Sequence, residues 1–99
     1  MTYRIRFTEE AEADLLRLYE FLLQRDLQLA EQALGNIRQA LALLETFPFA
    51  CRKAREDEPR LRELLIPFGN EGYVALYEID DATTVTMLAF RHQREDDYH

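Results

Sequence analysis

The sequence predicts one α+β domain spanning residues 1–99, in which a helical hairpin packs on a mostly antiparallel sheet in the order β-α-α-β-β-β. Three observations predict it. The first residues alternate between polar and apolar with the period of two that is typical of a strand. Two longer segments then carry leucine and alanine at helical spacing. Three further alternating segments, separated by turn-forming residues, close the chain.

The N-terminal segment predicts a strand followed directly by a helix. Tyr3, Ile5 and Phe7 alternate with polar neighbours, which gives the strand one buried face. Thr8 is an expected helix N-cap, and the three glutamates behind it suit the positive end of a helix dipole. We expect the helix to run from about Glu9 to Gln24. Its apolar stripe contains Ala11, Leu15, Leu18 and Leu22, widened by Tyr19 and Leu23.

A second helix is predicted to begin after Asp26, an expected N-cap, and to end before Pro48, which cannot continue it. Its apolar face runs from Ala30 to Phe47, and small residues on that face would let the two helices approach closely. Residues 48–60 combine two prolines with a mixed run of charges. We expect this segment to be an exposed polar connector.

The C-terminal third predicts an antiparallel meander. Strands are expected over 61–68, 73–79 and 84–90, joined by turns at 69–72 and 80–82. Arg62 shares strand parity with Leu64 and Ile66, so we expect it at an edge of the sheet rather than on its solvent face. Residues 91–99 follow the last strand as a short polar tail.

Composition excludes several function classes. The formal net charge is −7, and because phosphate binding depends on Lys and Arg displacing counterions, we expect no direct DNA binding and favour a protein partner. No apolar run approaches the roughly 20 residues of a membrane span, so no membrane association is expected. The single Cys51 cannot form an internal disulfide, which favours a reducing cytoplasm.

The tail holds the residues that could carry chemistry. His92 could deprotonate a 2′-hydroxyl while Arg91 and Arg94 neutralise phosphate, with Tyr98 nearby, which would suit RNA cleavage. The alternative is a solvated strand end that pairs with the neighbouring acids. No metal or cofactor is expected, since His92, His99, Glu95 and Cys51 have no recognised ligand spacing.

Two further groups point to partner surfaces. Basic residues occur in the first strand, at Arg4 and Arg6, and in 48–62, where five stand against three acids. Together they either balance the acidic helices or dock an acidic partner. Both helices are also rich in leucine, although a two-layer domain has only one interior. Four apolar residues lie off the main stripes, and we expect another chain to cover some of them: Leu16, Phe21, Leu27 and Leu29.

The chain resembles the ParE branch of the RelE/ParE toxins, known as plasmid stabilisation proteins of type II toxin–antitoxin modules. The resemblance covers nearly the full length. It rests on the Tyr3–Thr8 strand and cap, on Ala11, Asp14 and Leu15, on Phe47-Pro48 and on Arg62 within 61–64. It continues in 72–77 and ends in 88–95 and Tyr98.

The resemblance implies a function as well as a fold. ParE toxins poison DNA gyrase without being enzymes, and a small antitoxin wraps their helices and sheet edge. RelE toxins cleave mRNA in the ribosome. Their chemistry transfers poorly, because Val74 stands where that branch has Arg, 64–66 contain no lysine, and His92 replaces an Arg.

We therefore expect a cytoplasmic toxin that binds a protein target, with gyrase as the candidate, and that forms a hetero-oligomer with its cognate antitoxin. The expected target-binding residues are Arg60, Arg62, Arg91, His92, Arg94 and Tyr98. The expected antitoxin contacts are Leu16, Phe21, Leu27 and Leu29. Two alternatives stay open: a ribosome-dependent endoribonuclease that uses His92, Arg94 and Tyr98, and a non-toxic relative that binds only its antitoxin.

Overall fold

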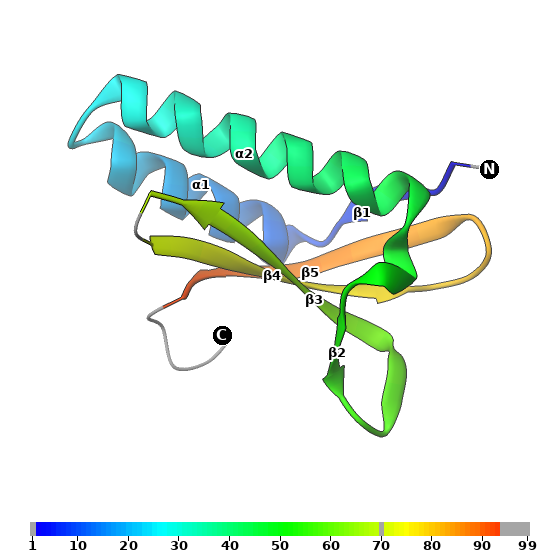
Figure 1. The fold of residues 1–99 in the computed structure, drawn as a ribbon. Coiled ribbons are helices and arrows are strands. Elements are labelled where there is room, and N and C mark those ends of the chain that lie inside the picture. Colours follow the sequence, from blue (N-terminus) through cyan, green and yellow to red (C-terminus); the bar gives the residue numbers. More distant parts are fainter. Residues whose placement is uncertain (1, 70, 94–99) are drawn as a thin grey trace.

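The computed structural model describes residues 2–69 and 71–93, and it confirms an α+β fold of two layers. Figure 1 shows the helices α1 (Glu9–Leu23) and α2 (Leu27–Thr46) lying together on one face of a single sheet. The sheet contains β1 (Arg4–Phe7), β2 (Arg52–Arg55), β3 (Glu58–Phe68), β4 (Glu71–Ile79) and β5 (Thr84–His92).

Both helices begin at the residues that the sequence predicts. The Thr8 side chain accepts a hydrogen bond from the Ala11 amide at 3.0 Å, and the Asp26 carboxylate accepts one from the Gln28 amide at 2.8 Å. Each bond satisfies an amide that has no partner within the helix. Helix α2 ends at Thr46, and Pro48 opens the short 3-10 helix η1 (Pro48–Ala50).

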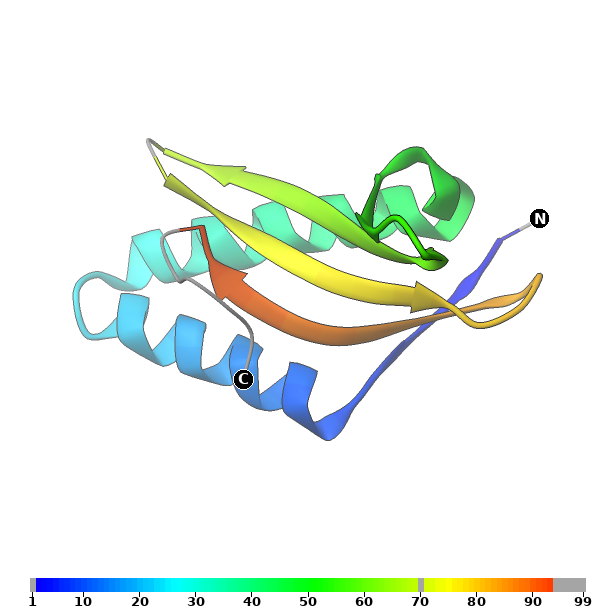
Figure 2. The same cartoon turned by 90° about the horizontal axis from the view of Figure 1, so that it is seen from below.

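The strand order across the sheet is β1-β5-β4-β3-β2. β1 runs parallel to β5, and every other neighbouring pair is antiparallel. This order places β1 beside β5, with β1 and β2 at opposite edges of the sheet. The α1–α2 hairpin connects β1 to β2 by crossing over one face of the sheet. Figure 2 looks at the sheet from below, where no helix covers β3, β4 and β5.

The prediction of a polar connector over 48–60 is wrong. Residues 52–55 form β2, which pairs with β3 through Arg52↔Glu63 and Arg55↔Glu58, so β3 begins at Glu58 and not at residue 61. Alternating hydrophobicity gives no signal for such a strand, because nearly all of its side chains are exposed. Arg62 consequently lies between Lys53 of β2 and Tyr77 of β4, so its expected place at a sheet edge is also wrong.

The core lies between the helices and the inner face of the sheet. Leu18, Leu22, Ile37 and Leu44 of the helices pack on inward-facing strand residues, which include Ile66, Tyr77, Val85, Met87 and Phe90. Two predicted core positions are instead exposed: Leu23 at 41% and Phe47 at 58%. No helix in the described part of the chain is long and apolar enough to span a membrane.

Candidate functional site

The helix-free face of the sheet is apolar at its centre. Strand alternation puts Leu65, Val74, Leu76 and Ala89 on this face, opposite the inward-facing Tyr73, Ala75 and Tyr77. Leu65 is 47% exposed, Leu76 is half-buried, and Val74 and Ala89 are buried. The acidic Glu63 and Glu78 also lie here, and Glu63 forms an ion pair with Arg52 at 3.1 Å. An apolar and acidic centre of this kind is therefore better suited to contact another protein than to bind a phosphate backbone.

Arg91 and His92 belong to β5, which extends two residues beyond the predicted strand end. Arg91 pairs with Val74 and lies on the helix-free face, whereas His92 pairs with Tyr73 on the helix side. The His92 and Tyr73 rings meet edge-on with centroids 5.8 Å apart, and Tyr73 stacks on Phe68 at 5.9 Å. His92 therefore completes an aromatic row across three strands. Arg94 and Tyr98 lie outside the described residues.

Arg62 holds the segment that follows α2. Its guanidinium group donates to the carbonyl oxygens of Pro59, Phe49 and Cys51 at 2.6, 3.2 and 2.8 Å, and its Cζ atom lies 5.2 Å from the centre of the Phe49 ring. These contacts stabilise η1 and the approach to β2. They also present the Phe49 side chain, which is 51% exposed, at the surface.

Tyr77 anchors the same segment from inside the core. Its hydroxyl group donates to the Pro48 carbonyl at 2.6 Å, and the side chain is fully buried. Burial raises the pKa of Tyr77, and the neighbouring Cys51 thiol raises it further. Cys51 is half-buried, so it packs as a small apolar residue against this cluster.

The expected target-binding residues that the structure describes lie at two ends of the sheet. Arg60 is exposed at the start of β3, where it donates to the Asp80 carbonyl at 2.9 Å in the β4–β5 turn. The strand register puts that turn beside Val85. His92 is seven residues further along β5, so the turn and His92 are roughly 20 Å apart. Arg60 and Arg62 thus share one end of the sheet, and Arg91 and His92 the other.

Three of the expected antitoxin contacts are exposed and the fourth is half-buried, and the four do not form one patch. Leu16 is 57% and Phe21 60% exposed, and five residues of helix separate them by about 140° around α1. Leu27 opens α2 at the corner between the helices. Leu29 is half-buried and lies seven residues before Asn36, on the same side of α2.

That side of α2 faces an open edge of the sheet. The Asn36 side chain donates to the Pro67 carbonyl of β3 at 3.1 Å, which fixes its direction. β2 pairs only with residues 58–63 of β3, so residues 64–68 have no strand on their other side within the described chain. Leu43, 43% exposed, shares this side of α2. An extended segment flanked by apolar side chains can pair here.

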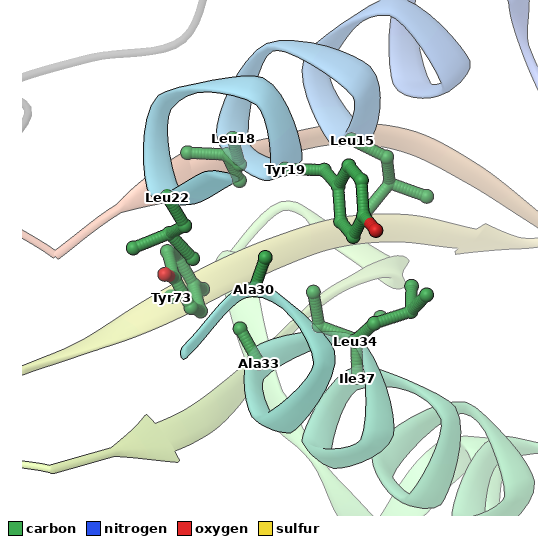
Figure 3. Close-up of a pocket in the computed structure, with 9 residues that line it drawn as sticks. All are labelled: Leu15, Leu18, Tyr19, Leu22, Ala30, Ala33, Leu34, Ile37 and Tyr73. Atoms are coloured by element: carbon green, nitrogen blue, oxygen red, sulfur yellow. The ribbon is translucent and has the colours of Figure 1, made fainter. Parts of the chain in front are cut away.

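The cavity between the two helices is apolar and small. Figure 3 shows Leu15, Leu18, Tyr19 and Leu22 of α1 opposite Ala30, Ala33, Leu34 and Ile37 of α2, with Tyr73 at the left between the two rows. Its volume is about 20 Å³, room for one water-sized sphere. Such a space fits neither a cofactor nor a substrate. No group of three or more metal-ligating side chains occurs among the described residues.

Sequence reasoning missed several exposed apolar residues. Leu23, Phe47, Phe49 and Leu65 are between 41% and 58% exposed. Leu23 and Phe47 follow the helical stripes closely enough to be assigned to the core. For Leu65, strand parity opposite to that of Leu64 and Ile66 was the available signal.

Comparison with known proteins agrees with this architecture. The family model described as "ParE toxin of type II toxin-antitoxin system, parDE" matches residues 5–97. The chain is 33% identical to "Toxin RelE1" of Caulobacter vibrioides over 79 residues, covering 80% of this chain and 82% of that protein. A solved structure described as "Chromosomal ParDE TA system from P. aeruginosa" superposes with a TM-score of 0.66 and 17% identity. The superposition covers 92% of this chain and 96% of the other.

Proposed function

The chain belongs to the ParE toxin family of type II toxin–antitoxin systems, and from that premise we propose that it inhibits growth by binding a protein target, namely DNA gyrase, and not by catalysis. A cognate antitoxin neutralises it in a hetero-oligomeric complex. The proposal places the protein in the cytoplasm, where gyrase is found.

The observation that carries the non-catalytic proposal is the character of the helix-free sheet face. Its centre holds the exposed Leu65 and the half-buried Leu76 beside Glu63 and Glu78, and an RNA-binding surface needs Lys and Arg there. The arginines of this face lie around that centre, on β1, on β2 and at the end of β5: Arg4, Arg6, Arg52 and Arg91. The chain as a whole carries −7. Arg91 and His92 lie on opposite faces of β5, so they do not converge on one phosphate.

We assign target recognition to Arg60, Arg62, Arg91, His92, Arg94 and Tyr98. Arg60 is exposed and donates to one backbone carbonyl, whereas Arg62 donates to three. Measuring growth inhibition in cells that lack the antitoxin tests whether the tail, residues 91–99, takes part in target recognition. Arg91→Ala combined with Arg94→Ala should abolish inhibition while the protein stays folded. Undiminished inhibition by that double variant would remove the tail from the target site.

A second candidate function is ribosome-dependent mRNA cleavage. It is favoured by the 33% identity to a relative named as a RelE toxin. His92, Arg94 and Tyr98 would then act on the 2′-hydroxyl and the phosphate. A non-toxic relative that only binds its antitoxin is the third alternative, and the same growth experiment separates it, since the wild-type chain would then be harmless.

We place the antitoxin on the exposed apolar surfaces of the helices and on the open edge of β3. Leu16, Phe21, Leu27 and Leu29 lie around three sides of the helical hairpin, so one chain must wrap the domain to cover them all. Replacing Leu16, Phe21 and Leu27 together by Gln should weaken antitoxin binding. An antitoxin that binds the triple variant as tightly as the wild type would contradict this placement.

A further inference from the structure

An exposed aromatic ring and three basic side chains gather where η1 leads into the β2–β3 hairpin. Figure 1 shows this hairpin projecting away from the two helices. Phe49 lies in η1, directly before β2, and is 51% exposed. Lys53 of β2 pairs with Arg62 of β3, and Arg60 stands two residues before Arg62, so the three basic side chains share one face of the strands. We call Phe49, Lys53, Arg60 and Arg62 the basic corner.

Phe49 is held in a fixed position although about half of it is exposed. The Arg62 guanidinium group donates to the Phe49 carbonyl at 3.2 Å and lies 5.2 Å from the centre of its ring. The carbonyl of the preceding residue, Pro48, accepts a hydrogen bond from the buried Tyr77 at 2.6 Å. A ring that is already ordered loses little conformational entropy on binding, and aromatic and Arg side chains are enriched in protein interfaces. Phe49 therefore has the properties of an anchor for a partner.

The basic corner is positive although the chain as a whole carries −7. The carboxylates of Asp57 and Glu58 form ion pairs with Arg55 at 3.4 and 3.5 Å. Both aspartates of the β4–β5 turn accept hydrogen bonds from threonine hydroxyls. Within residues 2–69 and 71–93, no acidic side chain forms an ion pair with any of the three basic residues of the corner. Their charge is therefore available to a partner.

Lys53 and Arg60 can supply donors to carboxylates. An Arg side chain has five N–H groups, and Arg60 donates to one carbonyl, that of Asp80, at 2.9 Å. Lys53 is exposed, and it lies directly across from Arg62 in the strand register. Hydrogen bonds between such cations and carboxylates are stronger than those between neutral groups. A ligand with carboxylates on both sides of one large apolar side chain therefore complements the basic corner.

We propose that the basic corner binds a short acidic segment of a partner protein, in which carboxylates flank one large apolar residue. The apolar residue packs on the Phe49 ring, and the carboxylates contact Lys53 and Arg60. A single-stranded nucleic acid also combines negative charge with rings that stack on aromatic side chains. Its charge is continuous, however, and the acidic helices of this chain repel a long polyanion.

The inference deepens the target recognition assigned above. It rests on the proposed function for the identity of the partner, and it adds Phe49 and Lys53 to the recognition surface together with the chemistry of the segment that they bind. Its experiments are therefore chosen so that the chemistry is tested separately from the target.

Synthetic peptides test the chemistry without gyrase. The probe is a labelled peptide of about ten residues, long enough to cross the corner when extended, with one Phe between flanks of Asp and Glu. Fluorescence anisotropy with the full chain should show saturable binding that weakens as salt is added. A peptide with Asn and Gln in place of every acid should bind at least about tenfold more weakly. No binding of the acidic peptide, equal binding of the two peptides, or tighter binding of an oligothymidine of the same length would overturn the proposal.

Phe49→Ala removes the anchor and keeps the backbone carbonyls that Arg62 binds, so the melting temperature should change little. Affinity for the acidic peptide should fall by about tenfold or more. The matched control is Phe21→Ala, which removes a ring of similar exposure, 60%, from α1 and should leave the affinity unchanged. Wild-type affinity in a folded Phe49→Ala variant, or an equal loss in both variants, would overturn the assignment of the site.

A pair of charge variants separates the basic corner from net charge. Lys53→Gln and Arg25→Gln each remove one positive charge from an exposed side chain. Arg25 lies between α1 and α2, and the 20 residues of α2 separate it from η1 by about 30 Å. Lys53→Gln alone should weaken binding of the acidic peptide, by about threefold or more. Equal weakening by both variants would assign the binding to net charge and overturn the site.

Two further measurements separate this inference from its premise. Sedimentation should show a monomer, and a dimer that Phe49→Ala abolishes would overturn the proposal, because a second copy would then occupy the corner. If the wild type inhibits growth and a folded Phe49→Ala variant inhibits it equally, the basic corner is not part of the target site and the inference fails. If the wild type itself does not inhibit growth, the proposed function fails, while the peptide titrations still decide the inference.

Discussion

Arg91 and His92 are consecutive in β5, yet Arg91 lies on the helix-free face of the sheet while His92 packs edge-on against Tyr73 on the helix side. The two side chains therefore cannot act on one group. His92 behaves as part of the aromatic row with Tyr73 and Phe68, whose centroids are 5.9 Å apart.

This geometry predicts different results for the two residues. We assign the contribution of His92 to its aromatic ring and not to its ring nitrogens, so His92→Phe, which keeps a ring against Tyr73, should leave both folding and growth inhibition unchanged. Arg91→Ala should reduce growth inhibition without unfolding the protein. A colony-forming assay with inducible expression measures growth inhibition by both variants. Loss of toxicity in a folded His92→Phe variant would instead favour general acid–base chemistry and a ribonuclease.

Arg62 predicts a stability effect. Arg62→Met should lower the free energy of unfolding by about 1–3 kcal/mol, because the carbonyls of Phe49, Cys51 and Pro59 lose their donor. Arg60→Met is the matched control: Arg60 is exposed and bonds one carbonyl, so its loss should cost under about 0.5 kcal/mol. Urea denaturation of the two variants checks the difference. Equal stabilities of the two variants would contradict this structural role of Arg62.

Asp14 predicts a second stability effect, at the junction of α1 and β5. It is 5% exposed, and its carboxylate accepts a hydrogen bond from the Phe90 amide at 2.9 Å. Asp14→Ala should cost about 2–3 kcal/mol, since a buried amide then loses a charged acceptor. The exposed Glu12→Ala, in the same helix, provides the reference. Equal melting temperatures of Asp14→Ala and Glu12→Ala would contradict this prediction.

Tyr77 predicts a loss of stability at alkaline pH. Its pKa is raised in the folded protein by burial, so the folded state holds the phenolic proton more tightly than the unfolded state does. Stability is therefore complete below the unfolded value of about 10 and falls as the pH rises beyond it. Tyr77→Phe should remove that alkaline slope and cost about 1 kcal/mol at pH 7, because the bond to Pro48 is lost. A slope that survives in Tyr77→Phe would assign the effect to another group.

Local chemistry explains which parts of the fold the sequence predicts. Thr8 and Asp26 cap their helices as expected because a cap depends only on the next few residues. β2 could not be found in this way, because its partner β3 supplies the pairing and neither face of the strand is buried. The extension of β5 through His92 likewise depends on pairing with Tyr73.

The candidate site was less predictable than the fold, for a physical reason. Whether Arg62 meets solvent or carbonyl oxygens depends on η1 and β2, which are distant from it in sequence. Leu23 keeps helical spacing but lies where α1 turns toward the corner, so periodicity alone places it in the core.

A plasmid supercoiling assay with purified gyrase, run beside primer extension on translated mRNA, tests most directly whether the protein acts by binding DNA gyrase. We expect relaxed or cleaved plasmid with intact message, and loss of that effect in the Arg91→Ala, Arg94→Ala double variant. Cuts in the message at codon-phased positions with gyrase activity unchanged would contradict it, and would assign the tail to catalysis.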